Sequence, residues 1–248
     1  MLSPGERIDK VNDNINLIQK TDGLTFGTDA LLLAAYVKGK YRYAVEIGGG
    51  TGIISLLLAT RGKAENIDCV EVQKDFYELI GRNCELNRLS NRIFPVLCDV
   101  RDYKPEKEYE LCFSNPPYMK KDAGKANDSQ SKNAARHEEN GTILEICRAA
   151  AGITKYGGTF AVVYRTDRLC DLIFAMRQVG FEPKRMTFVH ADEKSAPSMA
   201  LIEAKKGGKC GLKLTRPLII YNGYEHKTYT EEMNYIMQSG NFPPDFGV

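Results

Sequence analysis

The order of apolar and polar segments along most of the chain restricts the fold to one architecture. From residue 43 onward a short apolar run is followed by a glycine or an acid and then by a segment with helical character, and this order repeats. Strands are expected at 43–47, 66–70 and 94–98, and helices at 51–60 and 74–87. Strands that alternate with helices predict a parallel sheet covered by helices on its faces. The expected fold class is therefore α/β, with residues 41–248 forming one domain.

The pattern changes towards the end of the chain. The alternation first continues through a strand at 111–114, a helix at 141–151, a strand at 159–164 and a helix at 168–179. Two strands then follow, at 186–189 and 199–204, with no helix between them. Parallel neighbours need a long crossover, whereas antiparallel neighbours are joined by a short turn. We therefore expect a hairpin at the edge of an otherwise parallel sheet.

Residues 1–40 precede this pattern and are expected to form an N-terminal extension. Ile15 and Leu17 alternate with polar residues ahead of Asp22-Gly23, a dipeptide typical of hairpin turns. This predicts a short hairpin over 13–26 with its turn at Asp22-Gly23.

A helix is expected directly after the hairpin. Thr28 and Asp29 stand before the apolar, helix-forming run 30–36. Threonine and aspartate at such a position are typical of a helix N-cap, so the sequence predicts that the helix begins here.

Composition excludes several classes of protein. A formal net charge of +2 is too small to identify a polyanionic partner. The seven cysteines are odd in number and are never spaced as a C-x-x-C pair, which favours free thiols in a reducing compartment. No apolar run is long enough to span a membrane, and residues 1–20 lack the hydrophobic region of a signal peptide. The three histidines lie far apart and do not have the spacing of metal ligands. We expect a cytoplasmic protein without a metal.

Two lysine-rich segments, 119–136 and 205–216, interrupt the alternation and are expected to be loops. Their cations include Lys120, Lys121, Lys125 and Arg136 in the first segment and Lys205, Lys206 and Lys209 in the second. Clustered cations bind the phosphate backbone of nucleic acids, although lysine-rich loops are also common as solvated surface.

Four glycines fall within residues 48–52, after an apolar strand and before a helix. Glycine lets the backbone approach a ligand closely, because no Cβ intervenes. The dinucleotide fingerprint requires glycine at the first, third and sixth positions of the run, and Ile53 occupies the sixth. A pyrophosphate-binding loop is therefore disfavoured. A tight strand-to-helix turn without a ligand is the alternative.

Acidic residues end the next two strands. Glu71 follows the strand at 66–70, where a carboxylate can accept hydrogen bonds from both ribose hydroxyls of a nucleoside. Asp99 follows the strand at 94–98, where its side chain would reach an adenine amino group. A helix cap and a plain loop acid are the alternatives for these two residues.

Residues 114–118, Ser-Asn-Pro-Pro-Tyr, follow the fourth strand at the edge where such sheets bind ligands. An amide or adenine amino nitrogen is a poor nucleophile, because its lone pair is delocalised. The side-chain oxygen of Asn115 and the carbonyl of Pro116 can accept its N–H groups and favour the pyramidal transition state. Pro116 and Pro117 restrict the backbone, and Tyr118 offers a stacking face worth about 1–3 kcal/mol. A proline-rich turn with one aromatic residue is the alternative.

These motifs occur in the order that is typical of one family, and the chain resembles the bacterial tRNA1(Val) (adenine(37)-N6)-methyltransferases. The resemblance covers nearly the whole chain. The matching segments are 26–30, 46–52, 115–118, 135–138, 182–185 and 217–221. It implies a class I methyltransferase sheet of seven strands with a reversed last strand, and S-adenosylmethionine as the cofactor. The residue at 49 more often has a side chain in this family, so Gly49 implies a looser loop.

The resemblance also implies the site residues. Cofactor contacts are expected from Phe26, Gly27, Thr28, Glu46, Gly48, Gly50, Gly52, Glu71, Val72, Asp99, Val100 and Asn115. Catalysis is expected from Asn115, Pro116, Pro117 and Tyr118. The lysines named above and Arg136 would contact tRNA phosphates, and His137 would position the substrate or have a structural role.

Three alternatives stay open at this point. The first is N5-methylation of a glutamine in a release factor, because a glutamine amide presents the same planar nitrogen to the motif. Enzymes resembling that class carry a helical N-terminal domain ahead of the glycine loop, whereas only 47 residues precede Gly48 here, and this argues against the alternative. Adenine in ribosomal RNA or DNA would suit the same motif. A cofactor-binding module without catalysis would have no need of Asn115 or Tyr118.

Overall fold

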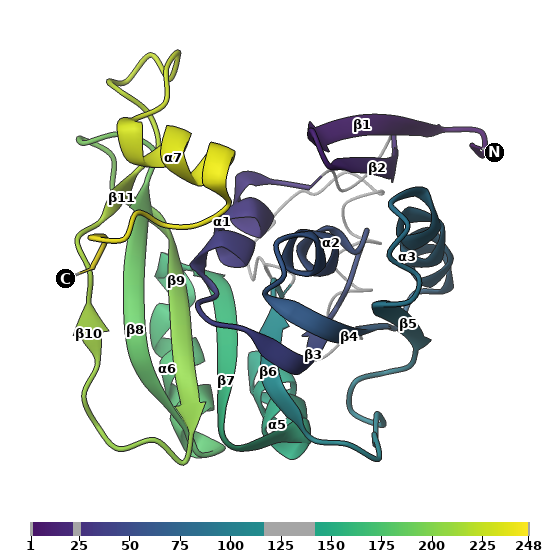
Figure 1. The fold of residues 1–248 in the computed structure, drawn as a ribbon. Coiled ribbons are helices and arrows are strands. Elements are labelled where there is room, and N and C mark those ends of the chain that lie inside the picture. Colours follow the sequence, from purple (N-terminus) through teal and green to yellow (C-terminus); the bar gives the residue numbers. More distant parts are fainter. Residues whose placement is uncertain (1, 22–25, 117–141, 248) are drawn as a thin grey trace, which may run out of the picture.

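The computed structural model describes residues 2–21, 26–116 and 142–247 (Figure 1). In this part of the chain a nine-stranded sheet is accompanied by a two-stranded hairpin. The main strands are β3 (Tyr41–Ile47), β4 (Ala64–Glu71), β5 (Ile93–Leu97), β6 (Tyr109–Ser114), β7 (Thr154–Arg165), β8 (Phe181–His190) and β9 (Pro197–Lys206). They lie in the order β8-β9-β7-β6-β3-β4-β5, and the strands from β3 to β7 pair in parallel. The predicted α/β class is confirmed.

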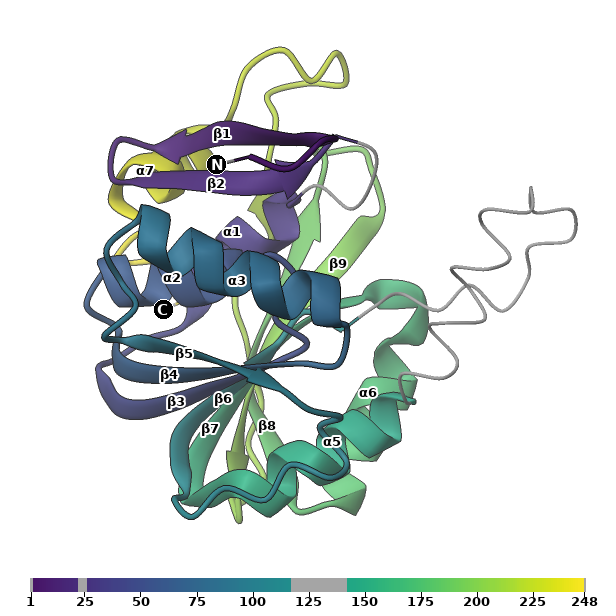
Figure 2. The same cartoon turned by 90° about the vertical axis from the view of Figure 1, so that its right-hand side faces the viewer.

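The helices cover both faces of this sheet, as Figure 2 shows. One face carries α1 (Thr28–Tyr36), α2 (Ile53–Thr60) and α3 (Lys74–Leu86), and the other carries α5 (Ile143–Ile153) and α6 (Leu169–Gln178). The 3-10 turn η1 (Thr166–Arg168) leads into α6. Successive side chains of a strand point to opposite faces, so Ala44 packs in the α1–α2 core and Val45 in the α5–α6 core.

The predicted strand pair at the end of the chain forms, but not at the edge. β9 is antiparallel to both β7 and β8 and lies between them. The two short strands β10 (Lys213–Leu214) and β11 (Leu218–Ile219) pair in parallel with β8 and form the border there. The expectation of an edge hairpin is therefore wrong in position, because the chain after β9 returns to cover β8. The reversed strand itself is confirmed.

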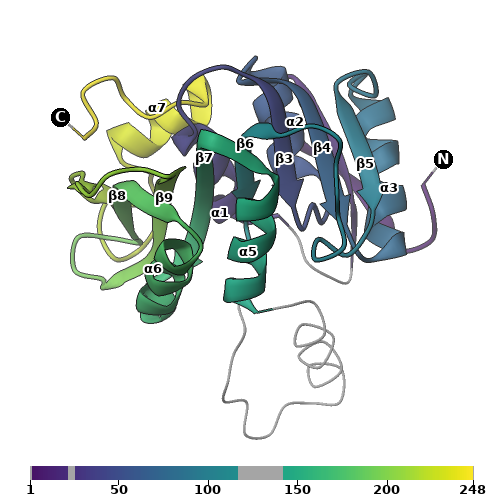
Figure 3. The same ribbon diagram turned by 90° about the horizontal axis from the view of Figure 1, so that it is seen from below.

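The C-terminal helix α7 (Glu231–Ser239) had no counterpart among the predicted elements. It packs beside α1, at the end of the sheet opposite α3 (Figure 3). The buried ammonium of Lys63 donates to the carbonyls of Ala34, Ala35 and Gly240, which ties the ends of α1 and α7 together. Burial lowers the pKa of Lys63 to about 7.

The N-terminal hairpin lies earlier in the chain than predicted. β1 (Glu6–Asn12) pairs antiparallel with β2 (Ile15–Lys20), so its turn falls at residues 13 and 14. The side chain of Asn12 accepts a hydrogen bond of 2.8 Å from the Asn14 amide and forms this turn. The predicted turn at Asp22-Gly23 is therefore wrong for this hairpin, and residues 22–25 lie outside the described residues.

Two asparagines, Asn83 in α3 and Asn87 at its C-cap, hold the hairpin against the domain. The Asn83 side chain accepts from the Ile18 amide at 2.7 Å and donates to the Ile18 carbonyl at 3.0 Å. One helical turn later, Asn87 makes the same pair of bonds to Asn16. Asn83 also donates to the carbonyl of Thr51, at the end of the glycine loop. The side-chain amides of Asn83 and Asn87 thus bind the backbone of β2 as a neighbouring strand would, and they fix the N-terminal segment beside the glycine loop.

Candidate active site

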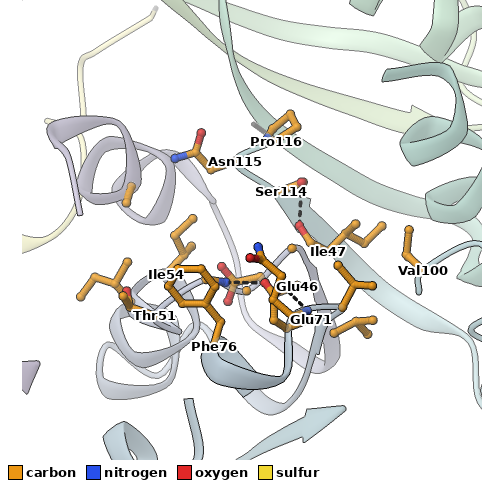
Figure 4. Close-up of a pocket in the computed structure, with 18 of the residues that line it drawn as sticks. Glu46, Ile47, Thr51, Ile54, Glu71, Phe76, Val100, Ser114, Asn115 and Pro116 are labelled. Carbon is orange, nitrogen blue, oxygen red and sulfur yellow. Dashed lines mark hydrogen bonds between the residues drawn. The ribbon is translucent and has the colours of Figure 1, made fainter. Parts of the chain in front are cut away.

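A cavity of about 380 Å³ opens at the carboxyl ends of β3, β4, β5 and β6 (Figure 4). This volume lies in the range of small-molecule sites. The predicted residues on its wall are Phe26, Gly27, Glu46, Gly48, Gly50, Glu71, Val72, Asp99, Val100, Asn115 and Pro116. Residues not predicted for the site are Asp29, Ala30, Ile47, Gly49, Thr51, Ile53, Ile54, Val70, Gln73, Phe76, Cys98, Ser114 and Ile146. The sequence motifs are thus brought together, along with apolar residues whose only sequence signal is that of core positions.

Two residues predicted to contact the cofactor, Gly52 and Thr28, are not part of this wall. Gly52 is the N-cap of α2 and has a φ of 79°, so glycine is required there by the turn into the helix. Thr28 is the first residue of α1, and the N-cap is Gly27, without a side-chain cap bond. The predicted capping role of Thr28 and Asp29 is therefore wrong.

The glycine loop is held close to β4. The amides of Gly48 and Gly49 both donate to the carbonyl of Val70, at 2.9 and 3.1 Å. A Cβ at position 49 would clash with the Cys69 sulfur and would lie 2.9 Å from Cδ1 of Ile80. The expectation that Gly49 loosens the loop is therefore wrong, because the absence of a side chain permits this close packing.

Glu71 connects the glycine loop with the segment that follows β4. Its two carboxylate oxygens accept from the amides of Gly50, at 2.9 Å, and Gln73, at 2.8 Å. Burial raises the pKa of Glu71. The carboxylate lies in the cavity wall, as Figure 4 shows, in a position set by backbone donors on both sides.

Glu46 reaches the same cavity from the end of β3. Its carboxylate accepts from the backbone amide and the hydroxyl of Ser55 in the first turn of α2, and from the thiol of Cys69. Glu46 is almost fully buried, and burial raises its pKa to about 7. This carboxyl group therefore changes its charge near neutral pH.

Asp99 and Val100 form the side of the cavity after β5. The Arg101 guanidinium bonds to both oxygens of Asp99, and this contact lowers the pKa of the carboxyl group. The following Tyr103 donates from its hydroxyl to Asp68 at 3.0 Å, which anchors the segment to β4.

Asn115 and Pro116 follow β6 and form part of the cavity wall. The hydroxyl of Ser114 donates to the carbonyl of Ile47 at 2.8 Å and joins β6 to the start of the glycine loop. The amide nitrogen of Asn115 donates to Oδ2 of Asp29 at 2.8 Å, across 86 residues of sequence. The other predicted residues of this region, Pro117, Tyr118, Lys120, Lys121, Lys125, Arg136 and His137, lie outside the described residues.

The second lysine group lies at the other end of the strands from the cavity, beside the amino end of β7. Because β9 is antiparallel to β7, its last residues lie beside the start of β7, far from the cavity. The ammonium of Lys205 donates to the Thr159 hydroxyl at 2.8 Å, and that of Lys206 donates to the carbonyls of Ala151 and Thr154 at 2.6 Å. Lys209 follows β9 and is exposed. The structure does not bring these lysines to the cavity.

Further properties bear on the expected class of protein. All seven cysteines are free thiols, and four of them are buried. Among residues 2–21, 26–116 and 142–247, no group of three His, Cys, Asp or Glu side chains is placed to hold a metal ion. In the same ranges no helix is long and apolar enough to cross a membrane.

The chain is similar to known proteins in sequence and in fold. The family described as methyltransferase small domain matches residues 20–171. The chain is 31% identical over 188 residues to the tRNA1(Val) (adenine(37)-N6)-methyltransferase of Flavobacterium johnsoniae, an alignment that covers 74% of this chain and 79% of the relative.

Solved structures show the same fold. A predicted O-methyltransferase from Agrobacterium tumefaciens superposes with a TM-score of 0.70 at 23% identity, over 87% of this chain and 98% of that one. TYW2 from M. jannaschii, solved in complex with AdoMet, superposes with a TM-score of 0.57 at 13% identity, over 83% of this chain and 87% of that one. The chain is a methyltransferase with the small methyltransferase domain and belongs to the tRNA1(Val) (adenine(37)-N6)-methyltransferase family.

Proposed function

We propose that this methyltransferase transfers a methyl group from S-adenosylmethionine to N6 of an adenine in tRNA, with the base flipped into the cavity beside Asn115. The observation that carries the proposal is the position of the Asn115 amide. Asn115 follows β6 in the wall of the cavity, and every described charged residue on that wall is acidic.

The cavity wall suits the charges of this cofactor. In the described ranges the charged residues of the wall are Asp29, Glu46, Glu71 and Asp99, and no lysine, arginine or histidine of those ranges lines it. Such a wall would repel a pyrophosphate and attract the sulfonium and ammonium groups of S-adenosylmethionine. The start of α2, where Ile53 and Ile54 line the cavity, offers a helix N-terminus to the cofactor carboxylate. Glu71 is placed to accept from the ribose hydroxyls.

The reaction then depends on the acceptors that follow β6. When bound, the cofactor supplies a methyl group on a sulfonium, which becomes a neutral thioether as the nitrogen–carbon bond forms. The side-chain oxygen of Asn115 and the carbonyl of Pro116 accept the two N–H groups of the attacking nitrogen and favour its pyramidal geometry. The surplus proton on the methylated nitrogen leaves to water.

The assignment of tRNA adenine rests on the names of the relatives and on the chemistry of a base. An adenine inside a duplex or a stacked loop must leave its stack before its N6 can reach a buried methyl donor. Tyr118 would then supply the stacking face for the extruded base. Tyr118→Ala should therefore raise the apparent KM for RNA, and Tyr118→Phe, which keeps the ring, should change it little.

A methyl-transfer assay with tRNA, ribosomal RNA, DNA and a release factor in parallel tests the proposal. We expect N6-methyladenosine from tRNA alone. Label found only in glutamine of the release factor, or only in one of the other nucleic acids, would replace the proposed substrate.

Asn115→Ala tests the chemistry itself. This variant should lose about 10²- to 10³-fold in kcat, the usual effect of removing one donor or acceptor from a transition state, with little change in cofactor affinity. Nearly normal turnover of a folded Asn115→Ala variant would exclude the proposed mechanism.

A further inference from the structure

We propose that Asp29 is a positioning residue for methyl transfer, which orients the Asn115 amide and strengthens its oxygen as an acceptor. The inference rests on the proposed function, because it assigns Asp29 a task only if Asn115 receives the substrate amino group. Its basis is the 2.8 Å hydrogen bond from Nδ2 of Asn115 to Oδ2 of Asp29. In Figure 4 the amide nitrogen of Asn115 points towards α1, the helix that carries Asp29.

An orienting partner is needed because the two ends of an amide have the same shape and opposite hydrogen-bonding properties. If the amide nitrogen of Asn115 faced the substrate, its N–H groups would meet the N–H groups of the substrate amino nitrogen, and no hydrogen bond would form. An ionised carboxylate can only accept, so it binds the nitrogen end of Asn115 and turns the oxygen end away from Asp29. Asp29 therefore selects the one amide orientation that the reaction can use.

The charge of Asp29 adds a second effect. A hydrogen bond to a carboxylate is stronger than one between neutral groups, and it polarises the amide so that more negative charge resides on its oxygen. Positive charge grows on the attacking nitrogen as its bond to the methyl carbon forms. The polarised oxygen of Asn115 therefore stabilises the transition state more than the ground state.

The position of Asp29 is itself set by local structure. Its Oδ1 accepts from the Ala30 amide at 2.9 Å, which directs Oδ2 towards Asn115. A Cβ at Gly27 would lie 2.5 Å from Oδ1 of Asp29, so a glycine is required at position 27 for the carboxylate to take this place. A carboxylate in the first turn of a helix also interacts favourably with the helix dipole. The N-cap of α1 is Gly27, so Asp29 is not the N-cap residue, and its bond to the Ala30 amide uses only one of its two oxygens.

A double-mutant cycle separates positioning from a general structural role. Asp29→Ala should lower kcat by about 10²-fold and leave cofactor affinity and the melting temperature nearly unchanged. Asp29→Asn keeps an acceptor oxygen but loses the charge, so its loss should be smaller, about 10-fold. If Asp29 acts through Asn115, adding Asp29→Ala to Asn115→Ala should lower kcat no further.

Asp75 provides a matched control. It is the second residue of α3, as Asp29 is of α1, but it is exposed, pairs with Lys20 and does not line the cavity. Asp75→Ala should therefore leave kcat unchanged while removing the same kind of acid from a first helical turn.

The outcomes distinguish this inference from the proposed function. Normal kcat in Asp29→Ala together with strong loss in Asn115→Ala would overturn the positioning role and leave the proposed function intact. Losses that multiply in the double variant would also overturn it, since Asp29 would then act on something other than Asn115. Normal turnover in Asn115→Ala would remove the proposed function and this inference together.

Discussion

The four acids on the described part of the cavity wall have different partners, and these partners decide what each carboxylate can do. Glu71 is held by backbone amides, Glu46 by Ser55 and a thiol, Asp99 by a guanidinium, and Asp29 by the Asn115 amide. A carboxylate paired with a cation is already neutralised, whereas one held by amides keeps its charge for a ligand. At the scale of single residues, Glu71 is therefore the stronger candidate for cofactor binding and Asp99 the weaker one.

Glu71→Gln tests this assignment. The substitution removes the charge and one of two acceptor oxygens, and a hydrogen bond to a charged group contributes about 1.5–3 kcal/mol. We expect a roughly 10- to 100-fold weaker affinity for S-adenosylmethionine in calorimetry. Glu65→Gln, an exposed change on the same strand, is the control and should bind normally. Unchanged affinity in a folded Glu71→Gln variant would remove Glu71 from the site.

Glu46 makes stability depend on pH in a direction that can be measured. Its pKa is raised by burial from 4.5 to about 7, so the folded protein holds this proton over a pH range in which the unfolded chain has released it. The stabilisation is complete below pH 4.5 and is lost as the pH rises through about 7. Glu46→Gln is neutral throughout, so its stability relative to the natural protein should increase between pH 5 and pH 8, by about 1–3 kcal/mol. Urea unfolding without cofactor measures this, and a difference that is constant with pH would contradict it.

At the scale of elements, the N-terminal hairpin depends on the helix it docks against. β2 has an unpaired edge, and such an edge needs partners for its backbone groups. The side chains of Asn83 and Asn87 supply them for Ile18 and Asn16. The amide of Phe26 in turn donates to the side chain of Gln19 on β2 at 3.2 Å. The hairpin thereby places the start of α1, with Asp29, over the cavity.

Removing these amides should have unequal effects. Asn83 is fully buried, so Asn83→Ala leaves three backbone groups without partners and should lower the free energy of unfolding by at least ~2 kcal/mol. Asn87 is less buried, and Asn87→Ala should lower it by about 1 kcal/mol. Denaturant unfolding compares the two, and hydrogen exchange at the Ile18 amide should accelerate in the first variant. Equal effects would show that the hairpin is held by other contacts.

At the scale of the whole molecule, we expect substrate and cofactor to bind at the carboxyl ends of the parallel strands. The cavity lies at the carboxyl ends of β3, β4 and β6. The end of β9, with Lys205 and Lys206, lies at the opposite end of the strands. The ammonium groups there are engaged by carbonyls and a hydroxyl. Residues 120–125 come soon after the proposed acceptor motif at 115–118, so their lysines are the better candidates for phosphate contacts.

Salt dependence of tRNA binding tests this asymmetry. Replacing Lys120, Lys121 and Lys125 with glutamine should flatten the slope of log affinity against log salt by about 2–3 units, because each phosphate contact releases counterions. Replacing Lys205 and Lys206 should instead lower the melting temperature and leave the slope unchanged. The same change of slope in both variants would mean that tRNA also contacts Lys205 and Lys206.

The sequence by itself determined the sheet and the glycine loop and led to the hypothesis of an acceptor motif at 115–118, since each rests on local chemistry. Burial on both faces makes parallel strands apolar, a strand-to-helix turn needs glycine, and proline fixes the backbone beside Asn115. These requirements act over a few residues, so they leave a pattern that can be read directly.

The tertiary structure alone decided which distant residues meet. The contact of Asp29 with Asn115 spans 86 residues, and in the sequence Asp29 resembles a helix cap. The insertion of β9 between β7 and β8, the docking of the hairpin on Asn83 and the far position of Lys205 depend likewise on pairings across the chain. A hydrogen bond needs only one donor and one acceptor atom, and it leaves no pattern in the sequence around either residue. These partners could therefore be identified only once the fold placed them within about 3 Å of each other.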